Sequence, residues 1–68
     1  MTDTKRLRDA IRASGLKISF LAEKMGISRQ ALQQKIDNDS EFKASEIAAL
    51  AGLLGLDIPE KEAIFFCS

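Results

Sequence analysis

Residues 21–36, LAEKMGISRQALQQKI, decide the fold, because they read as two short helices separated at Gly26. Apolar residues of the first helix recur at i, i+3, i+4 and i+7 and so lie along one face: Ile18, Leu21, Ala22 and Met25. Gly26 then suits the left-handed conformation in which many helices end. The pattern predicts a helix that stops at Gly26 and a chain that turns there.

The second helix of this segment spans about residues 28–37 and has two different faces. Ser28 is a good N-cap, because its hydroxyl can accept a hydrogen bond from a free backbone N–H. One face buries Ala31, Leu32 and Ile36, and the other carries only basic or uncharged polar side chains: Arg29, Gln30, Gln33 and Gln34. Two helices, a three-residue turn and a small residue, Ala22, where the helices cross describe a helix-turn-helix.

The polar face of the second helix points to DNA. Glutamine can bond the N6 and N7 edge of adenine bidentately, and arginine can do the same with O6 and N7 of guanine. We therefore predict base reading at Arg29, Gln30, Gln33 and Gln34. The alternative is an ordinary solvated face, and the presence of Ala22 and Gly26 favours DNA.

On a set of matching residues the chain resembles the helix-turn-helix of the lambda-repressor and Cro family, which comprises many small phage and bacterial transcription regulators. The matching residues are Leu21-Ala22, Gly26-Ile27-Ser28-Arg29 and Leu32. The resemblance implies an all-α, compact five-helix DNA-binding domain in which helices two and three form the helix-turn-helix. It covers about residues 3–66. The chain departs from the family at Lys17, where Thr or Ser is usual, and at Lys35, where many members have an apolar residue.

The resemblance also implies where the DNA backbone is held. Members of the family contact phosphates from the start of helix two and from the loop after helix three. We place phosphate binding at Lys17, Ser19, Ser28, Asn38, Ser40 and Lys43. Asp39 and Glu41 weaken the case for the loop. These acidic residues also suggest a calcium loop with Asp37, but Phe42 and Ala48 stand where glycine and glutamate are needed, so we expect no metal.

The remaining helices are predicted at about residues 3–14, 44–54 and from Pro59 onward. Lys5, Arg8 and Arg12 lie opposite the apolar stripe of the first helix, either as a solvated face or beside a phosphate backbone. Adjacent apolar residues near the C-terminus cannot all face one core. We therefore predict a homodimer interface at Leu53, Phe65 and Phe66, with the alternative that both phenylalanines enter the monomer core.

Composition limits the possible classes of protein. The 68 residues are predicted to form one domain, residues 1–68, with 46% apolar content. We expect no membrane span, because the chain has no run of about 18 apolar residues. We also expect no signal peptide, because the stretch from Lys5 to Arg12 is charged throughout. A single cysteine, Cys67, cannot form an internal disulfide, which fits the cytoplasm. Without histidine, a nucleophile–base pair or a glycine-rich phosphate loop, we expect neither an enzyme nor a cofactor or small-molecule substrate.

The net charge is zero, but its distribution is uneven. Residues 1–43 have a net charge of +3 and residues 44–68 one of −3. A DNA-binding domain needs a local basic surface and not a basic total. The leading hypothesis is a sequence-specific double-stranded DNA-binding transcription regulator of the Cro or repressor kind. The alternative is a protein-interaction module on the same fold, such as an antitoxin or an antirepressor partner.

Overall fold

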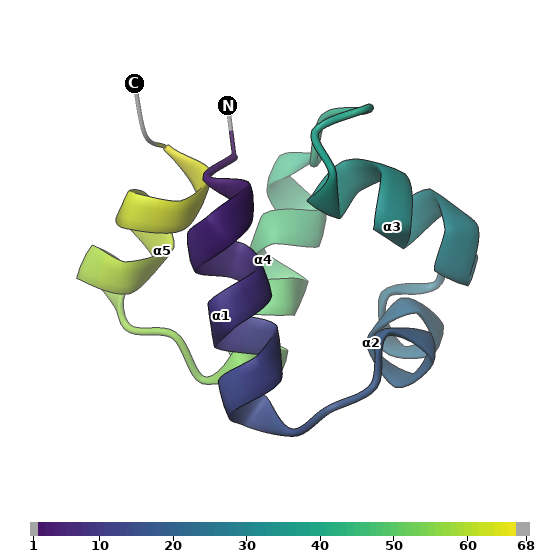
Figure 1. The fold of residues 1–68 in the computed structure, drawn as a ribbon, viewed down its shortest axis with the longest axis horizontal. Helices are drawn as coiled ribbons and strands as arrows, with labels where there is room; N and C mark the ends of the chain where they lie inside the picture. The colour runs from purple at the N-terminus through teal and green to yellow at the C-terminus, as the bar shows by residue number, and fades with distance from the viewer. Residues whose placement is uncertain (1, 67–68) are drawn as a thin grey trace.

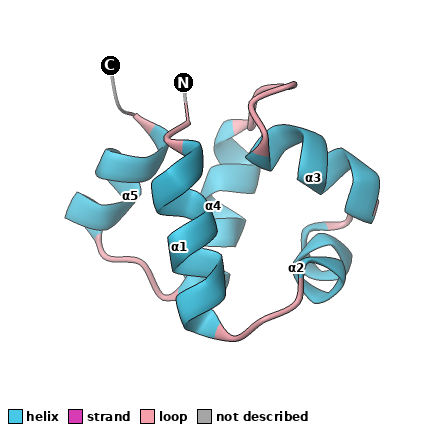
Figure 2. Ribbon diagram, in the orientation of Figure 1, coloured by secondary structure: helices cyan, strands magenta, loops and turns pink. Residues whose placement is uncertain are grey.

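Five α-helices make up the computed structural model, which describes residues 2–66 (Figures 1 and 2). Their bounds are α1 Thr4–Ser14, α2 Ile18–Met25, α3 Arg29–Ile36, α4 Ala44–Leu54 and α5 Ile58–Phe65. Residues 2–66 contain no strand, so the prediction of a five-helix, all-helical domain is confirmed over this range. Cys67 lies outside the described residues. None of the helices described has both the length and the apolar character needed to cross a membrane.

Local signals in the sequence set most helix ends. The side chains of Asp3, Ser28 and Asp57 accept hydrogen bonds from backbone N–H groups in the first turns of α1, α3 and α5. At the end of α4, Gly55 has a φ of 69°, and its N–H and that of Leu56 donate to carbonyls of the last turn. The backbone N–H and carbonyl groups at these helix ends are therefore hydrogen-bonded within the chain.

The core draws on every helix. Its fully buried side chains come from α1 to α4, namely Leu7, Leu21, Leu32, Ile36 and Leu50. From α5, Ile64 and Phe65 are 4% and 3% exposed. The Phe65 ring meets Phe42 edge to face with centroids 5.3 Å apart. This corrects the expectation for Phe65, which belongs to the core and offers no surface to a partner.

The helix α1 lies between α5 on one side and the α2–α3 pair on the other (Figure 1). The backbone N–H of Asp3 donates to the carbonyl of Ile64 at 2.7 Å and so ties the start of the chain to α5. The molecule measures 27 × 23 × 20 Å. The helices α5 and α3 lie on opposite sides of α1 (Figure 1).

A largely buried ion pair joins α3 to α4. The Lys35 ammonium lies 3.1 Å from Oε1 of Glu46, and the two side chains are 13% and 12% exposed. Lys35 also donates to the carbonyl of Glu41 at 2.9 Å, and Oε1 of Glu46 accepts the backbone N–H of Lys43 at 2.8 Å. The departure from an apolar residue at position 35 is therefore matched by an acidic partner on the next helix.

We predict that Glu46→Ala lowers the free energy of unfolding by about 2–3 kcal/mol, because it removes the ionic partner of the largely buried Lys35 ammonium and the acceptor of the Lys43 N–H at the start of α4. Urea denaturation measures this change. The matched control is Asp9→Ala, which breaks the Lys5–Asp9 pair at a similar 3.2 Å but with side chains 87% and 53% exposed. This control should cost less than about 1 kcal/mol. Equal losses in the two variants would contradict the prediction.

Glu46 also makes stability depend on pH. The backbone N–H of Lys43, and after it the Lys35 side chain, lower the pKa of Glu46 below its ordinary value of 4.5. Because the pKa is lower in the folded than in the unfolded chain, the stabilisation is complete above pH 4.5 and is lost as the pH falls through the folded value. In Glu46→Gln this contribution to the pH dependence of the free energy of unfolding should be absent, as urea denaturation at several pH values would show.

Candidate nucleic-acid interface

The α2–α3 unit is fixed at its turn by backbone hydrogen bonds. Gly26 has a φ of 73°, and its N–H donates to the carbonyl of Glu23 at 3.1 Å. The N–H of Ile27 donates to the carbonyl of Ala22 at 3.1 Å, which completes the glycine-capped end of α2. The hydroxyl of Ser28 then accepts the N–H of Ala31 at 3.0 Å. Any other residue at position 26 would have to adopt a conformation that L side chains rarely take.

Three of the four residues predicted to read bases are freely presented. Arg29, Gln30 and Gln34 are exposed on α3. Within residues 2–66 their side chains form no ion pair or hydrogen bond. Their donors and acceptors are therefore available to a ligand at no cost in broken contacts.

Gln33, the fourth, is half-buried and engaged. Its Nε2 donates to both carboxylate oxygens of Asp37, each at 3.2 Å. Asp37 in turn accepts a hydrogen bond from the Arg8 guanidinium of α1. The Arg8 hydrogen bond, and then that of Gln33, holds the pKa of Asp37 below its ordinary value. Sequence reasoning did not find this cluster, because Arg8 and Asp37 stand far apart in the chain.

The residues predicted to hold phosphates lie at the surface. Lys17, Ser19, Ser28, Ser40 and Lys43 are all exposed. Lys17 is the N-cap of α2 and gives it no side-chain hydrogen bond, so the first N–H groups of that helix are open to an anion. Ser28 uses its hydroxyl oxygen as an acceptor in its own helix and still has its O–H to donate.

Asn38 has a structural role that the sequence did not reveal. Its φ is 67°, in the left-handed region that asparagine tolerates better than most residues. Its N–H and that of Asp39 donate to carbonyls of Lys35 and Gln34 and close α3. Its side-chain amide donates to the carbonyl of Thr2 at 2.9 Å. Asn38 therefore ends the helix and anchors the N-terminus, which reduces its value as a phosphate ligand.

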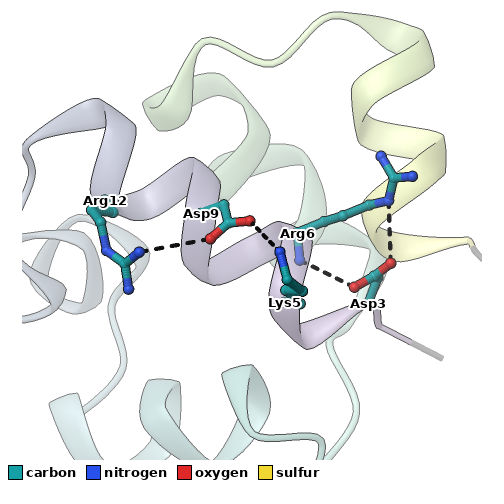
Figure 3. Close-up of polar contacts among 5 residues, drawn as sticks. All are labelled: Asp3, Lys5, Arg6, Asp9 and Arg12. Atoms are coloured by element: carbon teal, nitrogen blue, oxygen red, sulfur yellow. Dashed lines mark hydrogen bonds and ion pairs between the residues drawn. The ribbon is translucent and has the colours of Figure 1, made fainter.

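The basic side chains of α1 point in different directions and have different acidic partners. Figure 3 shows Lys5, Asp9 and Arg12 in one row, while Arg6 reaches across toward α5 with Asp3. Arg12 is 82% exposed and has only a long contact of 3.8 Å with Asp9. A shallow hollow beside α3 is lined by Arg8, Arg12 and Gln33 with three isoleucines, Ile11, Ile18 and Ile36.

The outer face of α5 is apolar and open. Ile58 is 72% exposed and Phe66 is 60% exposed, and both line a shallow hollow with Lys61 and Glu62. Leu53 is half-buried and packs against the core, so it has little area left for a partner. The surface that remains for an interface is the α5 face, which we define by Ile58, Lys61, Glu62 and Phe66. The sequence analysis did not predict Ile58 as part of it.

Comparison with known proteins adds no relative: no family model, no curated protein and no solved structure matches the chain.

Proposed function

We propose that the protein is a sequence-specific double-stranded DNA-binding transcription regulator, of the kind that the lambda-repressor and Cro family exemplifies. In this proposal the α2–α3 unit is a helix-turn-helix, and α3 enters the major groove. The single observation that carries the proposal is the free, exposed set of Arg29, Gln30 and Gln34 on α3. These side chains provide the donors and acceptors that base edges require, and phosphates would not repel them.

Selection of bound duplexes from a randomised DNA pool tests this function directly. At low salt the protein should enrich one sequence pattern, and the affinity for that pattern should fall as salt rises, because the contacts at α2 and in the loop release counterions. A pool that stays random after repeated rounds, at every salt concentration, would contradict the proposal.

We further propose that two copies bind one operator through the α5 face. One α3 reads only a few base pairs, too few to select a site among roughly 10⁶ competitors in a genome. In a two-fold arrangement the same patch meets itself, so Lys61 of one copy can face Glu62 of the other while Ile58 and Phe66 become buried. Recognition helices of such dimers sit about 34 Å apart, that is about 17 Å from the axis. A molecule 27 Å long, with α3 and α5 on opposite sides of α1, can satisfy this distance.

Lys43→Ala is predicted to weaken binding to all sequences by a similar factor, because an ammonium at the exposed start of α4 contacts phosphates and not bases. The slope of log affinity against log salt should become shallower by about one unit. Equilibrium titrations of a selected and a scrambled duplex at several salt concentrations measure both effects. Lys5→Ala removes the same charge from α1, where Lys5 is exposed and paired with Asp9, and is the control. A loss confined to the selected duplex would assign Lys43 to base reading.

The exposed α5 face also favours a second candidate function, a protein-interaction module without DNA binding. The net charge of −3 over residues 44–68 is consistent with it. In that case a variant with both Arg29→Ala and Gln30→Ala would retain its function in the cell, and only changes at Ile58 or Phe66 would abolish it.

A further inference from the structure

The residue that follows the last turn of α3, the C-cap Asp37, carries a carboxylate that faces a predicted base reader. Asp37 follows Gln33 by four residues, which places the two side chains on the same side of the helix. Nε2 of Gln33 lies 3.2 Å from each oxygen of Asp37. This contact distinguishes Gln33 from Gln30 and Gln34, whose amides have no partner within residues 2–66.

The chemistry of the contact fixes the direction of the amide. A glutamine amide donates at one end and accepts at the other, and the two ends can exchange by rotation about its last torsion. An ionised carboxylate only accepts, so it can hold only the NH₂ end. While Asp37 holds Nε2, the Oε1 of Gln33 is the end left free for a ligand.

Arg8 makes the arrangement compatible with DNA. An isolated carboxylate at the end of a recognition helix would repel phosphates. The guanidinium of Arg8 reaches Asp37 from α1 and supplies the opposite charge. It also holds Asp37 from a separate helix, so that the orientation of the carboxylate does not depend on α3 alone. Asp39, two residues later, is exposed and forms no ion pair among the described residues.

We propose that Asp37 is a positioning residue that sets base specificity by holding the Gln33 amide with its oxygen toward the DNA. This inference rests on the proposed function. The base edge that Gln33 meets must then offer a hydrogen-bond donor, as adenine does at N6 and cytosine at N4, and guanine and thymine are disfavoured there. Asp37 itself touches no base.

The test compares binding of purified variants to a set of operators that differ at single base pairs. Gln33→Ala first identifies the base pair that Gln33 reads. Asp37→Ala should reduce the preference at that same base pair by roughly fivefold, the low end of what one good contact discriminates. Asp37→Asn keeps the size of the side chain but can donate as well as accept, so it no longer fixes the direction of the Gln33 amide and should lose the preference as Asp37→Ala does. Asp39→Ala removes the same charge nearby without touching Gln33, and should leave the preference unchanged.

A double-mutant cycle separates positioning from direct reading. In the Gln33→Ala background, Asp37→Ala should have no further effect on preference at this base pair, because its only route to the base is removed. Thermal melts confirm that each variant is folded. An unchanged preference in Asp37→Ala would overturn the inference, and so would a new preference at a different base pair. Failure of the proposed function looks different, since the unmodified protein would then show no preference at any base pair.

Discussion

Replacing both Arg29 and Gln30 with alanine is expected to reduce affinity for the selected operator by about a hundredfold or more. Each good bidentate contact to a base discriminates by roughly 1–3 kcal/mol, and the double variant removes two adjacent candidates at the start of α3. Because both side chains are exposed and have no partner within residues 2–66, the folded domain should retain its stability. Titration of operator and scrambled duplexes, together with a urea melt, measures the two quantities separately.

The contrast between duplexes is what makes this prediction specific. Loss of Arg29 also removes one positive charge, which lowers affinity for every sequence. Lys43→Ala provides the size of that general effect, because Lys43 is predicted to contact phosphates and not bases. The operator should lose far more than the scrambled duplex in the double variant. Equal losses of affinity for the operator and the scrambled duplex would contradict base reading by α3.

Residues that act locally could be predicted from the sequence. Gly26 and Ser28 fix the turn through backbone angles and hydrogen bonds within a few residues, and such effects are visible in the order of amino acids. The buried stripe of α2 follows from helical period in the same way. The exposure of Arg29 and Gln30 follows from the apolar positions of α3 on the opposite face.

Contacts between distant elements could not be predicted. Arg8 and Asp37 form an ion pair only because α1 packs beside the end of α3, and no local sequence pattern predicts this contact. Lys35 and Glu46 are a similar case. Lys35 differs from the apolar residue that the resemblance leads one to expect, but the sequence does not indicate that Glu46 is its partner. The resemblance predicts Asn38 as a phosphate ligand, whereas in the structure its left-handed backbone ends α3 and its side-chain amide binds the carbonyl of Thr2.

The two adjacent phenylalanines show a related limit. Helical geometry requires that they point in different directions, but it does not say which one is buried. The answer depends on the tertiary position of Phe42, which the Phe65 ring contacts. Phe66 remains 60% exposed and lines the same hollow as Ile58. A substitution of Phe66 is therefore expected to affect the proposed dimer most strongly.

Phe66→Lys is expected to abolish binding of two copies to one operator and to lower affinity for the full site by at least about 30-fold, the loss typical of a central interface residue. The melting temperature of the dilute protein should change little, because the side chain is mostly exposed in the monomer. A lysine at the centre of a two-fold contact would face its own copy, so charge repulsion adds to the lost apolar area. Sedimentation of the protein–DNA complex counts the copies bound.

Two further variants decide whether the α5 face as a whole is responsible. Ile58→Lys places the same charge at the other exposed apolar residue of the face and should also leave one copy per operator. Phe66→Leu keeps an apolar side chain and should retain two. Binding of two copies by Phe66→Lys and Ile58→Lys alike would place the interface elsewhere, and one copy of the unmodified protein on a palindromic operator would rule out the dimer altogether. Retained pairing in Phe66→Leu, with its loss in both lysine variants, would identify burial of apolar surface on α5 as the force that joins the two copies.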